Sequence, residues 1–176
     1  KKRILILSML IAGTSWVFAA PQEPVFSVVE KEQTSYLSTL KELVSIESGS
    51  RDREGLDKIS QLIFNRLKAL GGQVEFIEPG ADMYRMHDTP DRPGRMVKAE
   101  FKGAGTKKIL LIAHMDTVYL KGMLAKQPFR IDGDRAYGLG ISDDKQGIAL
   151  ILHTLDVLKK TKFNEYGKIT VLRSEE

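Results

Sequence analysis

Residues 109–118 read ILLIAHMDTV, an unbroken apolar run that ends in a histidine and an aspartate. The apolar residues Ile109 to Ala113 predict a strand that is buried on both faces, as in a sheet covered by helices. Because side chains alternate along an extended chain, His114 and Asp116 should lie on the same side, at the carboxyl end of this strand. Open α/β sheets place their ligand sites at that edge. The stretch therefore predicts a central strand that delivers two polar side chains to a site.

The segments around this strand alternate between helical and extended patterns. Helices are predicted around Tyr36 to Val44, over Arg53 to Leu70 and over Lys145 to Lys160, and strands at Val74 to Ile77, Met96 to Phe101 and Lys168 to Leu172. Asp132-Gly133-Asp134 predicts a hairpin turn, and Pro79 to Gly94 predicts an exposed loop. We therefore expect an α/β fold, a layered domain with a mixed, mostly parallel sheet flanked by helices.

Composition bounds the class of protein. The chain has 176 residues, of which 42% are hydrophobic and 28% charged, and this suffices for one domain with a core. The net charge of +4 includes Lys1, Lys2 and Arg3, and without them 24 basic residues stand against 23 acidic ones. The sequence has no basic patch of the kind that would indicate a nucleic-acid partner, so we expect none. Because the sequence has no cysteine, disulfides do not hold the fold together.

The N-terminal segment has the layout of a secretory signal peptide. Residues 1–3 are basic, an interrupted apolar run follows over residues 4–17, and small residues come next. A membrane anchor is the alternative, although the run is short for a membrane span. We expect residues 1–19 to be a signal peptide and residues 20–176 to be the mature chain. The mature protein should be periplasmic or secreted in a bacterium, with no membrane association after processing.

A second polar cluster opens the last predicted helix. Gly138-Leu139-Gly140 leads into Asp143-Asp144, and a helix N-terminus favours negative charge. Simple capping by one of the aspartates is the plain alternative, and a dinucleotide-binding loop fails because Asp143 replaces its third glycine. In the first cluster, an imidazole oriented by a carboxylate is a good zinc ligand, so His114 with Asp116 suggests a metal site. A surface histidine beside a capping aspartate is the alternative there.

The two clusters together resemble a known family. His114 to Val118, followed by Gly140 to Lys145, is similar to the two-part signature of the di-zinc aminoacylase/carboxypeptidase family of metallopeptidases. The segment Tyr119 to Phe129 is most similar to the bacterial glutamate carboxypeptidases of the carboxypeptidase G type. The resemblance extends from about Tyr36 to Leu172. It implies that residues 20–176 are the N-terminal portion of a di-zinc exopeptidase catalytic domain.

The resemblance also implies a role for each matching residue. His114 would bind one of two zinc ions, Asp116 would orient His114 as a catalytic residue, and Asp143 would bridge both ions. The peptide bond after Asp143 would be cis. A Glu-Glu pair completes this part of the family's site, with Glu175 as the catalytic base and Glu176 as a zinc ligand. His87 and His153, the other histidines, are expected to be structural or solvated.

The acidic pair departs from the family's spacing. The family has four residues between the last strand and its Glu-Glu pair, whereas only Arg173 and Ser174 intervene here. Two residues in a strand span about 6.8 Å, whereas a carboxylate ligand sits about 2.0–2.2 Å from zinc. Either the loop is shorter in this chain, or its last residues are foreign to the family, so the roles of Glu175 and Glu176 stay open.

The implied function is zinc-dependent hydrolysis of a C-terminal peptide or amide bond. Glutamate would be released from small folate-like or N-acylated substrates, by a homodimer when the protein is full length. Within the family, an aminoacylase, deacetylase or dipeptidase is the alternative. Outside the enzyme class, the alternative is a truncated, non-catalytic α/β remnant with weak or no metal binding. Because family members are longer and supply further ligands, the 176-residue chain alone is expected to be inactive.

Overall fold

Helices and strands alternate along the chain, which a computed structural model describes at residues 25–85, 87 and 89–174. The helices are α1 (Val25–Val44), α2 (Arg53–Ala69) and α3 (Gln146–Lys160), with a short helical turn, η1 (Ile141–Lys145), directly before α3. The strands are β1 (Gln73–Ile77), β2 (Met96–Lys102), β3 (Lys108–His114), β4 (Arg130–Asp132), β5 (Arg135–Tyr137) and β6 (Lys168–Ser174). The structure contains each predicted helix and strand. Strong apolar periodicity is a reliable signal for elements of this kind.

Two predictions lie outside the described residues. These are the signal peptide, residues 1–19, and the acidic pair Glu175 and Glu176, and both stay predictions. From Val25 onward, none of the described helices is long and apolar enough to cross a membrane.

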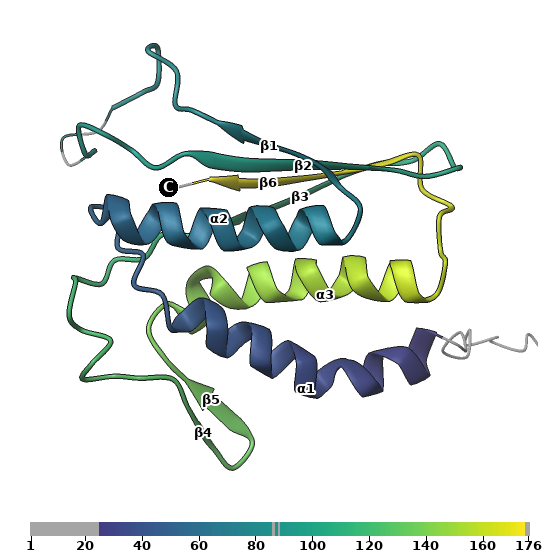
Figure 1. Cartoon of the computed structure of the whole chain (residues 1–176), viewed down its shortest axis with the longest axis horizontal. Helices are drawn as coiled ribbons and strands as arrows, with labels where there is room; N and C mark the ends of the chain where they lie inside the picture. Colours follow the sequence, from purple (N-terminus) through teal and green to yellow (C-terminus); the bar gives the residue numbers. More distant parts are fainter. Residues whose placement is uncertain (1–24, 86, 88, 175–176) are drawn as a thin grey trace, which may run out of the picture.

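The main sheet has four strands in the order β1-β2-β6-β3 (Figure 1). Strand β2 pairs antiparallel with both β1 and β6, whereas β3 pairs parallel with β6. The predicted layered fold with a mixed sheet is confirmed, but the prediction of mostly parallel pairing is wrong for the described strands. A parallel pair needs a crossover connection, and only β3 and β6 are joined through a helix, α3. A loop joins β1 to β2, and β4 and β5 form a separate hairpin.

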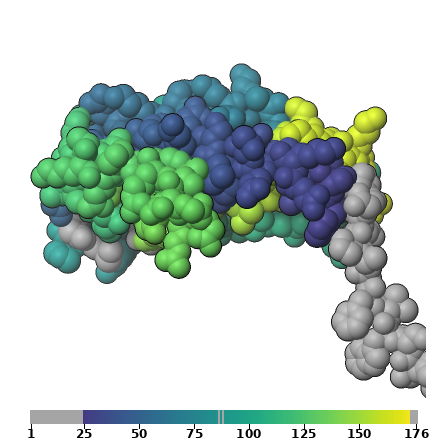
Figure 2. All heavy atoms as spheres, turned by 90° about the horizontal axis from the view of Figure 1, so that it is seen from below, coloured from purple at the N-terminus to yellow at the C-terminus, as the bar shows by residue number. Residues whose placement is uncertain are grey.

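All three helices lie on one face of the sheet (Figure 1), and α1 runs along the outer surface beside α3 (Figures 1 and 2). The buried residues that join these layers are Leu43 and Val44 of α1, Ile59, Ile63 and Leu67 of α2, Val97 and Ala99 of β2, Ile148 and Leu152 of α3, and Ile169 and Val171 of β6. Their spacing of four residues in α2 and α3 and of two in the strands creates one apolar face on each of these elements. The hydrophobic core therefore lies between the helices and one face of the sheet.

Strand β3 is the edge strand of the described sheet rather than a central strand. The exposed fractions of Leu110 and Ile112 are 57% and 60%, whereas Ala113 is buried. The prediction that this strand is buried on both faces is therefore wrong. The reason is that, among the described strands, β3 pairs only with β6, and the described helices cover only the face of the sheet away from Leu110 and Ile112. An apolar run shows which side chains a strand carries, but not what covers them.

Helix α2 begins and ends with standard caps. The Asp52 carboxylate accepts a hydrogen bond from the N–H of Gly55, which satisfies one of the open donors of the first turn. At the other end Gly71 has φ of 99° and donates to the Lys68 carbonyl, while Gly72 donates to the Leu67 carbonyl. This is the Schellman arrangement, for which a left-handed glycine is suited. The caps fix the ends of the helix that carries Arg53.

A buried polar network joins α1 to α3. The His153 Nδ1 and Nε2 atoms lie 3.0 Å from Glu32 Oε2 and 2.9 Å from Thr39 Oγ1. The Lys160 ammonium contacts the Glu32 carboxylate and lies 2.7 Å from Asp156 Oδ2. Within the described ranges, Glu32, His153 and Asp156 form a group whose potential metal-ligand atoms lie within 4.8 Å of one another. Because the Lys160 ammonium already forms ion pairs with both carboxylates, we assign this group to the helix interface as an ion network.

Glu32→Gln should lower the free energy of unfolding by about 1–2 kcal/mol near neutral pH, because a charge-assisted hydrogen bond to Lys160 is lost. The Lys160 ammonium, followed by His153, holds the pKa of Glu32 below its usual value. A carboxyl whose pKa is lowered on folding adds stability above its unfolded pKa and loses it as the pH falls through its folded pKa. The deficit of the variant should therefore shrink below about pH 4.3.

Urea unfolding at about pH 7 and about pH 3.5 measures this difference. The exposed Glu30→Gln on the same helix is the control, and it should change stability little at either pH. An equal deficit for Glu32→Gln at both pH values would contradict the assignment of the network.

Candidate metal centre

His114 ends β3 and has a carboxylate at each of its ring nitrogens. Its Nδ1 lies 3.1 Å from Asp116 Oδ1, and its Nε2 lies 3.0 Å from Asp143 Oδ1. Asp116 is buried, whereas the Asp143 side chain is 80% exposed. The structure thus brings together the three side chains that the sequence singles out, from two segments almost thirty residues apart. Their catalytic and ligand roles stay predictions.

The turn η1 directs Asp143 toward the end of β3. Gly140, just before the turn, has φ of 68°, in the left-handed region that favours glycine. A Cβ atom at Gly140 would lie 2.4 Å from the Thr117 side chain, so the close approach of the two segments also requires glycine. The backbone of Asp143 and Asp144 departs from helical geometry, and the peptide bond between them is cis. The helix α3 therefore begins only after the two carboxylates.

The geometry of His114 and Asp143 fits a shared zinc ion. Zinc binds imidazole nitrogen and carboxylate oxygen at about 2.0–2.2 Å, so two such atoms 3.0 Å apart can contact one ion. The carboxylate of Asp116 at Nδ1 would fix the tautomer of the ring and make Nε2 the ligand atom. His114 and Asp143 are a partial ligand set, because zinc in proteins is usually four-coordinate.

Two serines that the sequence did not single out hold the strand end in place. Ser50 Oγ donates to Asp116 Oδ2 at 2.8 Å, so one oxygen of this carboxylate is bound by Ser50 and the other lies next to His114. Ser48 Oγ donates to the Met115 carbonyl at 2.7 Å. In the sequence these serines stand out only as the end of a helical pattern, and no motif marks them. Their role becomes visible only when residues 48–50 lie against residues 115–117.

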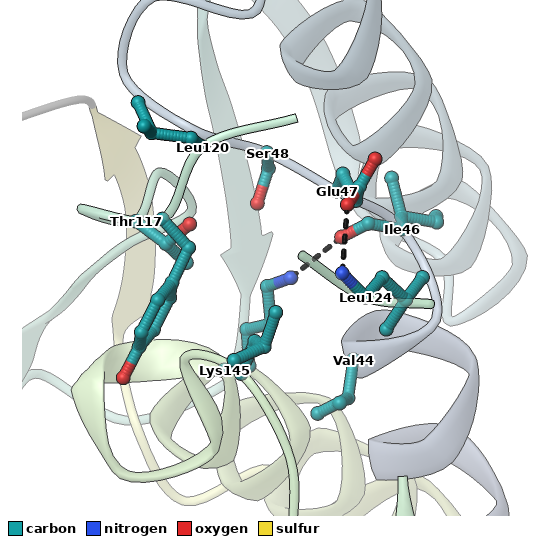
Figure 3. A pocket seen from close by; sticks show the side chains of 10 residues that line it. Val44, Ile46, Glu47, Ser48, Thr117, Leu120, Leu124 and Lys145 are labelled. Atoms are coloured by element: carbon teal, nitrogen blue, oxygen red, sulfur yellow. Dashed lines mark hydrogen bonds between the residues drawn. The ribbon is translucent and has the colours of Figure 1, made fainter. Parts of the chain in front are cut away.

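Lys145 is a buried cation directly after the two aspartates. Its side chain is 1% exposed, and its ammonium donates to the Ile46 carbonyl at 2.6 Å (Figure 3). Burial lowers the pKa of Lys145 to about 8. A signal for this burial exists in the sequence, because Lys145 stands three residues before Ile148 and seven before Leu152, on the apolar stripe of α3.

Glu47 fixes the loop that follows the strand end. Its Oε1 accepts a hydrogen bond from the N–H of Leu124 at 2.9 Å (Figure 3) and a second from the N–H of Gly122 at 2.8 Å. The N–H of Leu124, followed by that of Gly122, holds the pKa of Glu47 below its usual value. The carboxylate therefore stays ionised and organises the segment that resembles the glutamate carboxypeptidases.

A cavity of about 550 Å³ opens beside His114, Asp116 and Asp143. Its opposite wall comes from the loop between β1 and β2, through the residues Pro79, Met83, Tyr84, Pro90 and Pro93. The wall is largely apolar, while the floor carries the carboxylates and the imidazole. Cavities of this size and mixture suit small organic ligands.

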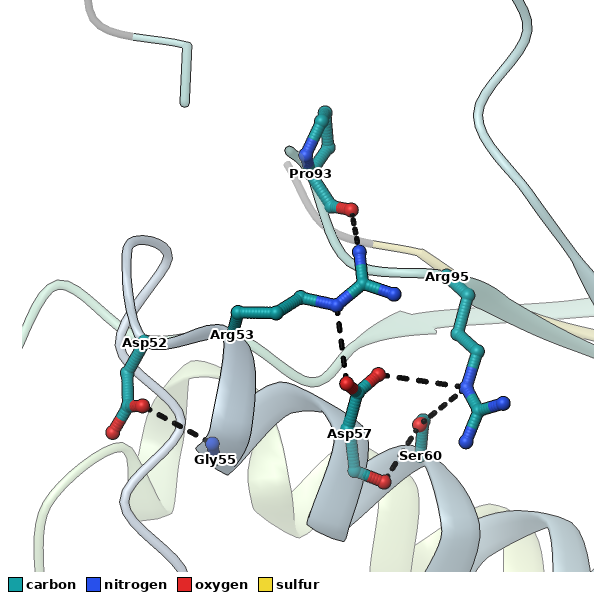
Figure 4. A network of polar contacts seen from close by, with 7 residues as sticks. All are labelled: Asp52, Arg53, Gly55, Asp57, Ser60, Pro93 and Arg95. Carbon is teal, nitrogen blue, oxygen red and sulfur yellow. Dashed lines mark hydrogen bonds and ion pairs between the residues drawn. The ribbon is translucent and has the colours of Figure 1, made fainter. Parts of the chain in front are cut away.

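The end of this loop is pinned to α2 (Figure 4). The Arg53 guanidinium donates to the Pro93 carbonyl and, through Nε at 3.2 Å, to Asp57. Arg95 lies 3.6 Å from the other oxygen of Asp57 and 3.6 Å above the ring centre of Phe76. The cavity wall next to Pro93 is therefore held at a fixed distance from the helix that begins at Arg53.

Comparisons with known proteins show which family this chain resembles. Residues 110–175 match the peptidase family M20/M25/M40. The chain is 42% identical over 169 residues to carboxypeptidase G2 of Pseudomonas sp. (strain RS-16). The aligned region covers 96% of this chain and 38% of that protein. The chain thus spans well under half the length of this relative.

Solved structures show the same fold. Human carnosine dipeptidase 1 superposes with a TM-score of 0.72 at 19% identity, over 85% of this chain and 33% of that one. The M20 family metallo-carboxypeptidase Sso-CP2 from Sulfolobus solfataricus superposes with a TM-score of 0.62 at 22% identity, over 80% of this chain and 30% of that one. At these identities the two structures are evidence for the fold alone.

Proposed function

We propose that this chain, which is similar to the peptidase family M20/M25/M40 over residues 110–175 and to carboxypeptidase G2 over most of its length, is part of a zinc-dependent exopeptidase that releases C-terminal glutamate. The observation that carries the proposal is the placement of His114 Nε2 3.0 Å from Asp143 Oδ1, with Asp116 at the other ring nitrogen. Hydrolysis of an amide bond needs an activated water and a polarised carbonyl, and a metal centre can provide both.

The chain's own residues would prepare the site for this chemistry. Asp116 orients the His114 ring so that Nε2 points toward Asp143. Ser50 in turn orients Asp116 by donating a hydrogen bond to its other oxygen. His114 and Asp143 would bind the zinc, with Asp143 as the carboxylate shared by two ions. Zinc, when bound, would lower the pKa of a coordinated water and polarise the carbonyl of the scissile bond. The predicted base Glu175 and ligand Glu176 lie outside the described residues.

The substrate proposal rests on the cavity and on the relative. The cavity has room for a small peptide or acylated amino acid beside the metal-binding atoms, and its apolar wall suits an acyl group. The 42% identity to a carboxypeptidase favours cleavage of a C-terminal bond, and the preference for glutamate is taken from the predicted resemblance. Export to the periplasm and dimerisation stay predictions.

A substrate panel tests this function. The full-length product of the gene that encodes this chain would be assayed with one acyl group joined to glutamate, aspartate, leucine or lysine, and with unblocked dipeptides. We expect acyl-glutamate to give the highest kcat/KM. A preference for unblocked dipeptides would favour a dipeptidase instead, and no hydrolysis of any substrate would favour the non-catalytic alternative.

A further inference from the structure

The segment Ile46–Ser50 lies between the two halves of the candidate metal centre. On one side it is bonded to the residues that follow β3: the Thr117 N–H donates to the Ser48 carbonyl at 2.8 Å. The Ser48 and Ser50 side chains add the hydrogen bonds to Met115 and Asp116 described above. The half of the centre that contains His114 is therefore attached to this segment by several bonds.

Lys145 attaches the other half to the same segment. Its ammonium reaches the Ile46 carbonyl at 2.6 Å, and its side chain is enclosed by Val44, Ser48, Thr117 and other residues (Figure 3). Lys145 is only two residues from Asp143, and both lie in the turn η1, directly before α3. Residues 46–50 thus connect the two halves of the centre. Lys145 binds this segment on the Asp143 side, and the residues after His114 bind it on the other side.

A purely apolar residue would fill this space at lower cost. Enclosing an ammonium ion is unfavourable, and replacing a buried charge with a well-packed apolar side chain is often neutral or stabilising. The charge therefore contributes something other than packing, and the feature it fixes is a backbone carbonyl beside the site. Partners that orient a ligand without touching the metal typically change metal affinity by 10- to 100-fold.

We propose that Lys145 is a positioning residue that holds Asp143 at the metal-sharing distance from His114 by anchoring η1 to the Ile46 carbonyl. The proposal rests on the proposed function, in which His114 and Asp143 bind zinc.

The test compares Lys145→Met with Lys159→Met in the full-length gene product. Lys159 is the control, because it lies at the far end of α3, the helix that Lys145 precedes, and its ammonium donates to the backbone carbonyl of Ala69 in α2 at 2.9 Å, away from the metal centre. Three measurements are made: thermal unfolding without metal, zinc affinity by competition with a coloured chelator, and the visible spectrum of the cobalt-loaded protein. Lys145→Leu serves as a second variant if methionine packs poorly.

We expect Lys145→Met to keep the unfolding temperature of the metal-free protein, to weaken zinc binding by about 10- to 100-fold and to alter the cobalt spectrum. Its kcat should fall more than its KM rises, whereas Lys159→Met should match the parent in all metal measurements. Unchanged zinc affinity and cobalt spectrum in Lys145→Met would overturn the proposal. Failure of both Lys145 variants to fold would also overturn it, because Lys145 would then be a core residue only. If the parent itself binds no zinc, the proposed function fails first.

Discussion

Asp143→Ala should lower kcat/KM for acyl-glutamate by about 10³-fold or more, which corresponds to a loss of about 4 kcal/mol in transition-state stabilisation. The Asp143 carboxylate lies 3.0 Å from His114 Nε2 and would be shared by two zinc ions. Its removal takes a ligand from both ions at once, whereas the loss of Asp116 would only disturb the orientation of His114. Zinc content per protein should fall together with activity, and both can be measured on the same sample.

Asp134→Ala is the matched control for this experiment. Both aspartates are exposed and come shortly after a glycine, but the 95% exposed Asp134 lies in the turn of the β4–β5 hairpin. This variant should retain the zinc content and kcat/KM of the parent. Normal activity in a folded Asp143→Ala protein would contradict the assignment of Asp143 as a ligand.

The chain of residues 20–176, produced alone, should show no measurable turnover and should self-associate. His114 and Asp143 are a partial ligand set, and the predicted Glu175 and Glu176 stand two residues from the family's position for their pair. Leu110 and Ile112 are both more than half exposed on the open face of the edge strand β3. A flat apolar edge strand is a known route to association through unpaired backbone groups and apolar side chains.

Light scattering over a range of concentrations measures this association. Replacement of Leu110 and Ile112 together by threonine should shift the chain toward the monomer, since the strand keeps its backbone but loses apolar surface. Lys108→Thr on the same face of the same strand is the control and should not reduce association. Monomeric behaviour of the unmodified chain with measurable release of glutamate would show that this prediction is wrong.

Local patterns predicted the elements of the fold but not their neighbours. The apolar periodicity of residues 53–70 predicted helix α2, because such a pattern depends on contacts within a few residues. The burial of β3 could not be read in the same way. Whether Leu110 faces a helix or solvent depends on which segments pack beside the strand, and this is a long-range property. The same limit explains why the pairing of β2 was not anticipated.

The site shows the same division. His114, Asp116 and Asp143 could be singled out because their spacing follows a strand end and a helix start. Ser50 could not, because a serine at the end of a helical pattern has many uses, and its bond to Asp116 spans 66 positions. The burial of Lys145 could have been predicted from the sequence, because this residue continues the apolar stripe of α3. What no sequence pattern showed is its partner, the backbone carbonyl of Ile46.

Hydrolysis by the full-length protein should depend on a zinc ion bound by His114 and Asp143. The most direct measurement is the turnover of acyl-glutamate by the full-length gene product, before metal removal, after chelation, and after zinc is added back. We predict that chelation abolishes turnover and that zinc restores it in the parent but not in Asp143→Ala. Full turnover in a metal-stripped, chelator-saturated sample would contradict the account.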